Sequence, residues 1–320
     1  MNNYVNNVTN FNNVNSKEKI EKKRFIEIDV AKGIAVCLMM FFHYFYLGEH
    51  MNILDVDTST GILHLCAKLA HTTFIIASGA NLVISTSGKT FKEYIPKKIK
   101  RGLYLVAVGL IISYLTKIEF GESYVKFGIM HFMGTATILS SFLLKWPTLI
   151  MILSSGILLL DYMLKHVKGI KERFYGVCEK NSFACFIAGI MNLKYDTLDH
   201  FSLIPYLGYF LLGGAIAFTC YKIHTVKEEM ANLEDVQINK WENKWENKNN
   251  LDEGERKGIT RRFAFLEIFD KFKDNIVIET LGWIGKRSLM FYIIHFIILY
   301  CLFKIMQITK ADRIAKLLSY

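Results

Sequence analysis

The sequence predicts an all-α fold, a polytopic bundle of about seven to eight membrane-spanning helices. Hydrophobic residues make up 52% of its 320 positions. They are concentrated in several apolar runs close to the length of about 20 residues that a bilayer requires. The basic residues lie mainly between these runs, which is typical of cytoplasmic loops beside anionic lipid headgroups. The net charge of +10 therefore does not indicate a nucleic-acid partner, and none is expected.

The first part of the chain sets the expected orientation in the membrane. Residues 1–23 are polar and end in a basic run, so they predict a disordered cytoplasmic N-terminus. No cleavable signal pattern is visible, so the first apolar run is expected to remain as an anchor. The loop 48–60 contains three acidic residues and no Lys or Arg, whereas 89–101 contains six Lys or Arg. By the positive-inside rule, the sequence predicts a plasma-membrane protein with its N-terminus in the cytoplasm.

Each predicted span is an apolar run bounded by polar, basic or turn-forming residues. The seven runs are 28–47, 62–85, 102–116, 127–144, 148–164, 203–221 and 289–306. The stretch 182–191 is too short to span and is interpreted as a re-entrant or interfacial piece. Seven spans would place the basic loop 165–180 outside, so an eighth span stays open.

The domain organisation follows from these runs. Residues 24–223 form the first part of a transmembrane core, and residues 276–320 complete it with the last span and an amphipathic tail. Between them, 224–275 is predicted to be a polar cytoplasmic linker, with the low-complexity repeat WENKWENK at 241–248.

The first span carries ionisable groups on one face. At 100° per residue, Asp29, Lys32, Val36, Met40 and His43 fall within about 60° of one face of the helix. Lys32 and His43 lie roughly 16 Å apart along the axis, at 1.5 Å per residue. Because such groups are costly against lipid, they are expected to face the bundle interior or a wet cavity. The alternative is a snorkelling lysine and a histidine that bonds to a neighbouring helix.

Histidines recur within or at the ends of the predicted spans, at positions 43, 64, 71, 131 and 295. Imidazole is the side chain best suited to exchange a proton near neutral pH, although each of these could instead be a packing residue. No two of them share a helix at the i,i+4 spacing of a metal-binding pair, and no metal site is predicted. The six cysteines show no CxxC spacing; only Cys178 and Cys185 could pair, and free thiols are expected.

Several stretches resemble the bacterial transmembrane acyltransferases, in particular the family of the heparan-alpha-glucosaminide N-acetyltransferase catalytic domain. That family is related to integral-membrane sugar O-acyltransferases with an Arg-x10-His motif, to which Lys32 and His43 are similar. The matching blocks occur in the family's order. They are IDVAKGIAVCLMMFFHYF (28–45), HTTFIIASGANLVIS (71–85), KFGIMHFMG (126–134), FSLIPYLGYFLLGGAIA (201–217) and LGWIGKRSLMFYIIH (281–295).

The resemblance implies transfer of an acetyl or other acyl group from cytosolic acyl-CoA to a hydroxyl or amine of a cell-surface glycan or similar acceptor. His43 is expected to be the base or a transient acyl carrier, with Lys32 near the thioester. His131 and His295 are candidates to orient the substrate or relay protons. Lys98 and Arg101 are expected to join Lys32 in binding the CoA phosphates.

Two departures from the family pattern and two rival functions accompany this interpretation. Lys32 stands where Arg is usual, so the charge remains but the bidentate fork is lost. Eukaryotic members place a functional His in the first external loop, where this chain offers only His50.

A proton-coupled transporter or flippase would also need buried Lys and His, although no internal repeat is visible. The third possibility is a membrane sensor or scaffold that docks through its linker.

Overall fold

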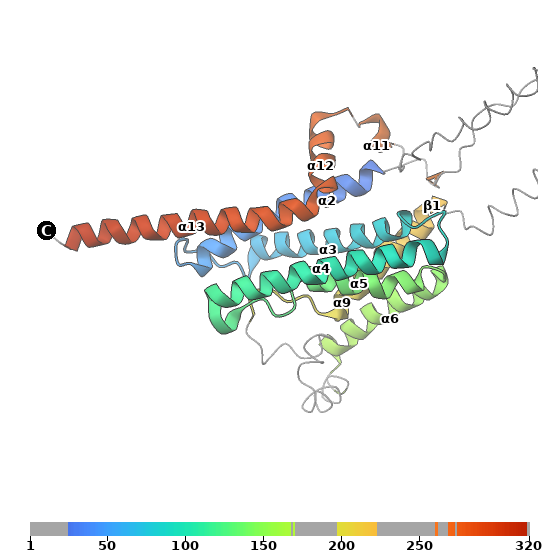
Figure 1. Cartoon of the computed structure of the whole chain (residues 1–320), viewed down its shortest axis with the longest axis horizontal. Coiled ribbons are helices and arrows are strands. Elements are labelled where there is room, and N and C mark those ends of the chain that lie inside the picture. Colours follow the sequence, from blue (N-terminus) through green and yellow to red (C-terminus); the bar gives the residue numbers. More distant parts are fainter. Residues whose placement is uncertain are drawn as a thin grey trace, which may run out of the picture.

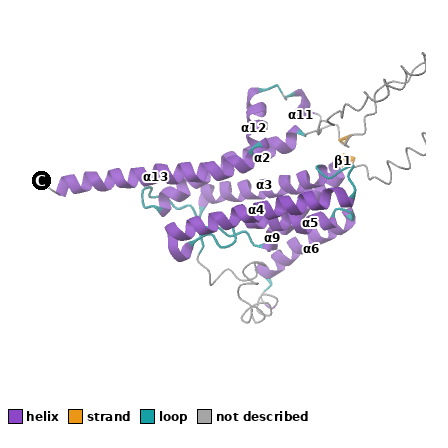
Figure 2. Ribbon diagram, viewed as in Figure 1, coloured by secondary structure: helices purple, strands orange, loops and turns teal. Residues whose placement is uncertain are grey.

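The computed structural model describes residues 25–167, 169, 197–222, 260–261, 268–272 and 274–318. Within these ranges the protein is a bundle of long helices lying side by side (Figures 1 and 2). Six helices are long and apolar enough to cross a membrane, and α5 is a shorter apolar helix in the same bundle. The apolar helices are α2 (Ile26–His50), α3 (Gly61–Ile84), α4 (Phe91–Phe120), α5 (Ile129–Leu143), α6 (Pro147–His166), α9 (Leu203–Cys220) and α13 (Ser288–Leu318).

The predicted helical membrane bundle is confirmed, and each of the seven predicted spans coincides with one of these helices. The predicted re-entrant piece at 182–191 and the repeat at 241–248 lie outside the described residues. The eighth span is therefore a prediction that the described helices do not address.

Helix α4 begins eleven residues earlier than expected, because the basic segment 89–101 is mostly helical and not a loop. Thr90 and Glu93 form a capping box, in which each side chain accepts a hydrogen bond from the other residue's backbone N–H. This cap allows the helix to start within a lysine-rich stretch. The sequence did not predict a helix there because the stretch is polar. Lys98 and Arg101 consequently lie on a rigid helix.

The sequence did not reveal α12 (Ile276–Lys286), which precedes the last span and packs against the first turns of α2 (Figure 1). The Asn275 side chain accepts a hydrogen bond from the Val277 N–H and caps this helix at 2.9 Å. With only eleven residues, α12 is too short to resemble a span. Beyond it, α13 continues as one helix to Leu318, so the predicted tail is an extension of the last span.

Two short strands pair across most of the predicted linker, one just before its start and one within it at 260–261. β1 (Tyr221–Lys222) follows α9 directly and pairs antiparallel with β2 (Thr260–Arg261). The Tyr221 hydroxyl also donates a 2.8 Å hydrogen bond to Glu27 on α2. The short helix α11 (Ile268–Lys271) then leads toward α12. The linker therefore leaves and re-enters the bundle at one point, close to the start of α2.

Helices α3 and α9 touch backbone to backbone through glycines. A Cβ built on Gly79 of α3 would lie 1.8 Å from the Phe210 carbonyl oxygen, and one on Gly213 of α9 would lie 1.9 Å from that of Ile76. Membrane helices use small residues in this way, because van der Waals packing replaces the hydrophobic effect in lipid. The crossing fixes α3, which carries much of the site described below.

Replacement of Gly79 by Ala is expected to lower the free energy of unfolding by about 1–3 kcal/mol, because the added methyl overpacks a backbone contact. Gly156→Ala on α6 is the matched control, since a Cβ there meets nothing within 4 Å. The measurement is thermal unfolding of both variants in detergent. Equal midpoints for the two variants would contradict this account of the crossing.

Candidate functional site

His43 of α2 and His295 of α13 lie against each other across the bundle. The Nδ1 of His43 is 3.0 Å from the Nε2 of His295, and the ring centroids are 5.1 Å apart. His295 is only 4% exposed, and its Nδ1 lies 2.7 Å from the Phe291 carbonyl oxygen one turn earlier on α13. Two of the predicted site residues, 252 positions apart in the chain, are thus in direct contact.

The hydrogen bonds determine which ring nitrogen carries each proton in the neutral pair. A carbonyl oxygen can only accept, so the His295 Nδ1 donates to Phe291. The Nε2 of neutral His295 must then accept, and the Nδ1 of His43 donates to it. An apolar bundle favours the neutral pair, since an unpaired charge there is costly. The His43 Nε2 therefore keeps an unprotonated lone pair.

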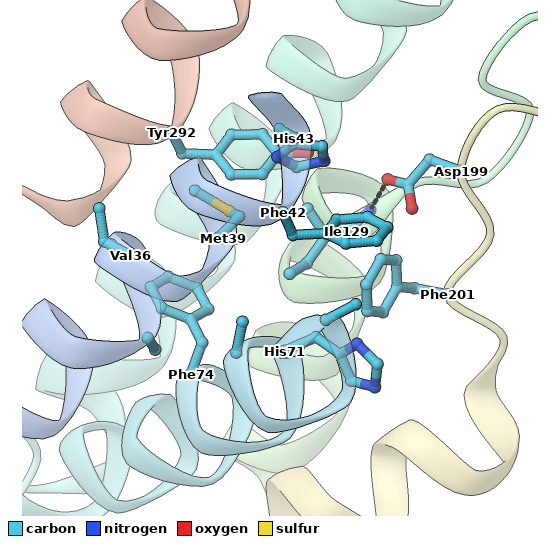
Figure 3. Close-up of a pocket in the computed structure, with 13 residues that line it drawn as sticks. Val36, Met39, Phe42, His43, His71, Phe74, Ile129, Asp199, Phe201 and Tyr292 are labelled. Atoms are coloured by element: carbon cyan, nitrogen blue, oxygen red, sulfur yellow. Dashed lines mark hydrogen bonds between the residues drawn. The ribbon is translucent and has the colours of Figure 1, made fainter. Parts of the chain in front are cut away.

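His43 of this pair lines a cavity of about 130 Å³ that we name the histidine cavity (Figure 3). Its walls are mostly apolar, with polar groups contributed by His43, His71, Asp199 and Tyr292. The remaining lining comes from α2, α3 and the segments around α5: Ala35, Val36, Met39, Phe42, Ala67, Ala70, Phe74, Ile129 and Phe201. Such a small apolar cleft with a few convergent polar groups is the usual form of a ligand site.

Asp199 reaches this cavity from the segment that precedes α9. Its carboxylate accepts the Ile129 N–H, 3.3 Å away at the start of α5, as the dashed line in Figure 3 marks. A Cβ on Gly128 would lie 2.8 Å from the same carboxylate oxygen, so only glycine leaves room for it. This contact gives a physical reason for the glycine in the KFGIMHFMG block.

The segment that carries Asp199 is firmly held. Leu198 donates its N–H to the Ser123 carbonyl, and Phe201 donates to the Phe127 carbonyl, both at 2.9 Å. The Tyr46 hydroxyl of α2 donates to the Leu198 carbonyl at 3.1 Å. Burial raises the pKa of the Asp199 carboxyl to about 6, against the N–H groups of Ile129 and His200, which lower it. The group therefore gains or loses its proton near neutral pH.

A second cavity, of about 70 Å³, contains the predicted cations. Lys32 of α2, Lys98 and Arg101 of α4 all line it, and we name it the cationic cavity. Lys32 is 8% exposed, so it is buried and does not snorkel. The Lys98 ammonium donates a 2.6 Å hydrogen bond to the Ser85 hydroxyl, which lines the same cavity. Further hydroxyl and amide groups there belong to Ser78, Asn81, Thr137 and Ser288.

His131 is separate from both cavities. It is 6% exposed on α5, where its ring stacks on Phe127 with centroids 5.7 Å apart. Its ring also fills the space beside Gly109 of α4, 2.9 Å from where a Cβ would lie. The structure therefore places His131 at a helix contact, away from His43 and His295.

Asp199, His71 and Tyr292 were not predicted as site residues. Tyr292 lies one turn before His295 in the matched block 281–295, so helical spacing could have pointed to it. His71 belonged to the histidine set without a role. Asp199 stands in a polar stretch without periodicity, and only the pairing of 123–129 with 198–201 brings it to the cavity. His50, the external-loop candidate, is exposed and stacks on Tyr46, with centroids 6.2 Å apart.

The apolar helices and the two cavities define the class of a multi-pass membrane protein with ionisable groups inside its helical bundle. Comparison with known families gives the narrower assignment. The family described as "Heparan-alpha-glucosaminide N-acetyltransferase, catalytic" matches residues 24–242, about two thirds of the chain, and the protein belongs to that family. This match supports a membrane acyltransferase and ends before α12 and α13, which carry Tyr292 and His295. No curated protein and no solved structure matches the chain.

Proposed function

We propose that this protein moves an acetyl or other acyl group from acyl-CoA to a hydroxyl or amine of a glycan or similar acceptor. The observation that carries the proposal is the succession of a cationic cavity and a histidine cavity along the same helices. One suits a phosphate-bearing donor, and the other offers a base and an acceptor-binding carboxylate. The family assignment favours acyl transfer over other chemistry.

The cationic cavity is proposed to hold the donor. CoA carries several phosphate groups, and Lys98 and Arg101 offer charges on one face of α4. Lys32 is buried on the wall of the same cavity and adds a third positive charge for these phosphates. A lysine acts there as a point charge and lacks the two-pronged grip of an arginine.

His43 is proposed as the general base. The acceptor oxygen or nitrogen attacks the thioester carbonyl while its proton passes to the His43 Nε2. The carbon–sulfur bond breaks, and the departing thiolate takes that proton, so His43 returns to its first state. His295 acts as a positioning residue, because its fixed Nε2 holds the His43 ring in the productive tautomer. A variant of this route passes through an acyl group carried transiently on His43.

Asp199 is proposed to bind the acceptor. Its carboxylate is fixed on the wall of the histidine cavity and can accept hydrogen bonds from hydroxyl or amino groups. The aromatic rings of Phe42, Phe74 and Phe201 line the same space and suit the apolar face of a sugar ring. In this proposal the protein lies in the plasma membrane, and the donor enters the cationic cavity from the cytoplasmic side.

A proton-coupled transporter or flippase remains the alternative, since buried Lys and His also serve as proton relays. Among the described residues no group of three or more His, Cys, Asp or Glu is placed to hold a metal ion. The experiment below separates transfer from transport.

The first test is transfer from radiolabelled acetyl-CoA in membranes that contain wild-type protein or His43→Ala. Loss of the base is expected to reduce acceptor labelling by at least about a hundredfold. His166→Ala, an exposed histidine at the end of α6, is the matched control and should leave the rate unchanged. Labelled protein without labelled acceptor would favour the acyl-histidine route. Equal transfer by His43→Ala at equal protein level would remove His43 from the mechanism.

The donor cavity makes a separate prediction. Lys98→Ala and Arg101→Ala are each expected to raise the KM for acyl-CoA by about tenfold, equivalent to one lost phosphate contact of about 1.4 kcal/mol. Lys100→Ala removes the same charge from an exposed position on the same helix and should change little. The KM for the acceptor should stay constant in all three variants. A shift in the acceptor KM alone would assign the cationic cavity to the acceptor.

The acceptor site predicts a pH dependence. Because the Asp199 carboxyl has a pKa of about 6, acceptor affinity in the wild type is expected to rise as the pH rises through that value. Asp199→Asn should show weaker acceptor binding without this rise. The other titratable groups of the cavity, His43, His71 and Tyr292, are present in both proteins, so the difference isolates Asp199. Asp55→Asn in the exposed loop is the control. Identical profiles would exclude this role.

A further inference from the structure

The two cavities occupy successive turns of the same helices. On α2, Lys32 lines the cationic cavity, and the histidine cavity begins at Ala35, one turn later. On α13, Leu289 lines the cationic cavity, and Tyr292 lines the histidine cavity. On α5, Ile129 lines the histidine cavity, and Met133, one turn later, lines the cationic cavity. The cavities are therefore arranged end to end along the bundle.

Phe74 is the residue that lines both cavities among the described residues. It lies on α3 between His71, which faces the histidine cavity, and Ser78, which faces the cationic cavity. Figure 3 shows its ring reaching from α3 toward Val36 of α2. The ring also packs against the main hydrophobic core, whose nearest member Ile75 is fully buried. Phe74 is therefore part of the wall at both the lysine end and the histidine end.

We propose that Phe74 partitions one passage between the two cavities and determines which acyl groups reach His43. The inference rests on the proposed transfer function, because the acyl end of a donor held in the cationic cavity must reach the acceptor beside the His43 Nε2. Lys32 and His43 are roughly 16 Å apart along α2, and the ring of Phe74 lies beside the path between them. Rotation of a phenylalanine ring needs no backbone change, so a small acyl group can pass while a long one is obstructed.

The partition also protects the donor. When no acceptor is bound, water in a continuous passage would attack the thioester in the acceptor's place. The carbon–sulfur bond would then break, a carboxylic acid would form, and the thiolate would take the proton. A closed apolar ring excludes that water. Phe74 is thus a specificity-determining residue for acyl size and for acceptor against water.

The first test measures access without any chemistry of transfer. Met39, on the wall of the histidine cavity, is replaced by cysteine in a chain whose six native cysteines are removed. An anionic, membrane-impermeant thiosulfonate is then applied from either face of oriented vesicles. In the protein that retains Phe74, the reagent is expected to label the cysteine at position 39 only from the face opposite the lysine-bearing one. With Phe74→Ala, labelling from the lysine-bearing face should rise by about tenfold or more, which corresponds to a barrier lowered by about 1.4 kcal/mol.

The second test measures specificity. Phe74→Ala is expected to release CoA without acceptor about tenfold faster than the wild type and to accept longer acyl chains. Phe74→Trp should have the opposite effect and slow transfer of all but the shortest acyl group. Phe41→Ala makes the same truncation on α2 at a side chain that is 51% exposed, and it should match the wild type. Where Phe74→Ala does not elute as folded protein, Phe74→Leu serves for both measurements.

The two tests fail independently. Labelling of Met39→Cys from both faces in the presence of Phe74, or from one face in its absence, would overturn the partition. Two-sided labelling in Phe74→Ala with no CoA release or transfer in any variant would keep the partition and reject the proposed acyl transfer. Unchanged acyl preference in both Phe74→Ala and Phe74→Trp would reject Phe74 as the residue that selects the acyl group.

Discussion

The cost of a polar group inside an apolar bundle governs the arrangement of this protein. Exposure of a lysine, a histidine or an aspartate to lipid has a high free-energy cost. Each such side chain therefore lies against a partner or a cavity within the bundle. The His43–His295 contact is the clearest result, since two imidazoles and a backbone carbonyl satisfy one another across helices α2 and α13. The same requirement places the buried Lys32 at the cationic cavity, where the partly buried Lys98 and the exposed Arg101 lie beside it. The cost of burial therefore accounts for the positions of Lys32 and His295.

Close helix packing gives these groups fixed positions. Glycines let α3 meet α9 and α2 meet α12 at backbone distance, which leaves little freedom for one helix to slide along another. Lys32 sits beside Gly33, whose Cβ position would be 2.0 Å from the Leu281 carbonyl oxygen of α12. The buried lysine is thus set by a contact with a helix that lies outside the family match. Preorganisation of this kind is what a transfer site requires.

The sequence predicts the helices, because they follow from local apolar periodicity. It does not predict contacts between residues that are far apart in the chain. Apolar runs located the seven apolar helices of the described part of the bundle, and the stripe on α2 placed Lys32 and His43 on the interior face. Spacing could not show that His43 would meet His295, or that His131 would turn toward Gly109, because the rotation of one helix against another is set by packing. Asp199 lies in an irregular segment, whose position follows from hydrogen bonds to residues about 70 positions away. Helix α12 was not predicted because its eleven residues are too few to span a membrane.

The short pairing of β1 with β2 has an evolutionary consequence. Because Tyr221 is paired with Arg261, the stretch between the strands starts and finishes at one place on the bundle. Its number of residues can change without altering the distance that its ends must bridge, and the entropy of closing a loop grows only slowly with length. Insertions, deletions or a whole added module at this position would leave the spacing of the helices that line the two cavities intact. Relatives of this protein are therefore expected to differ most in size at that site.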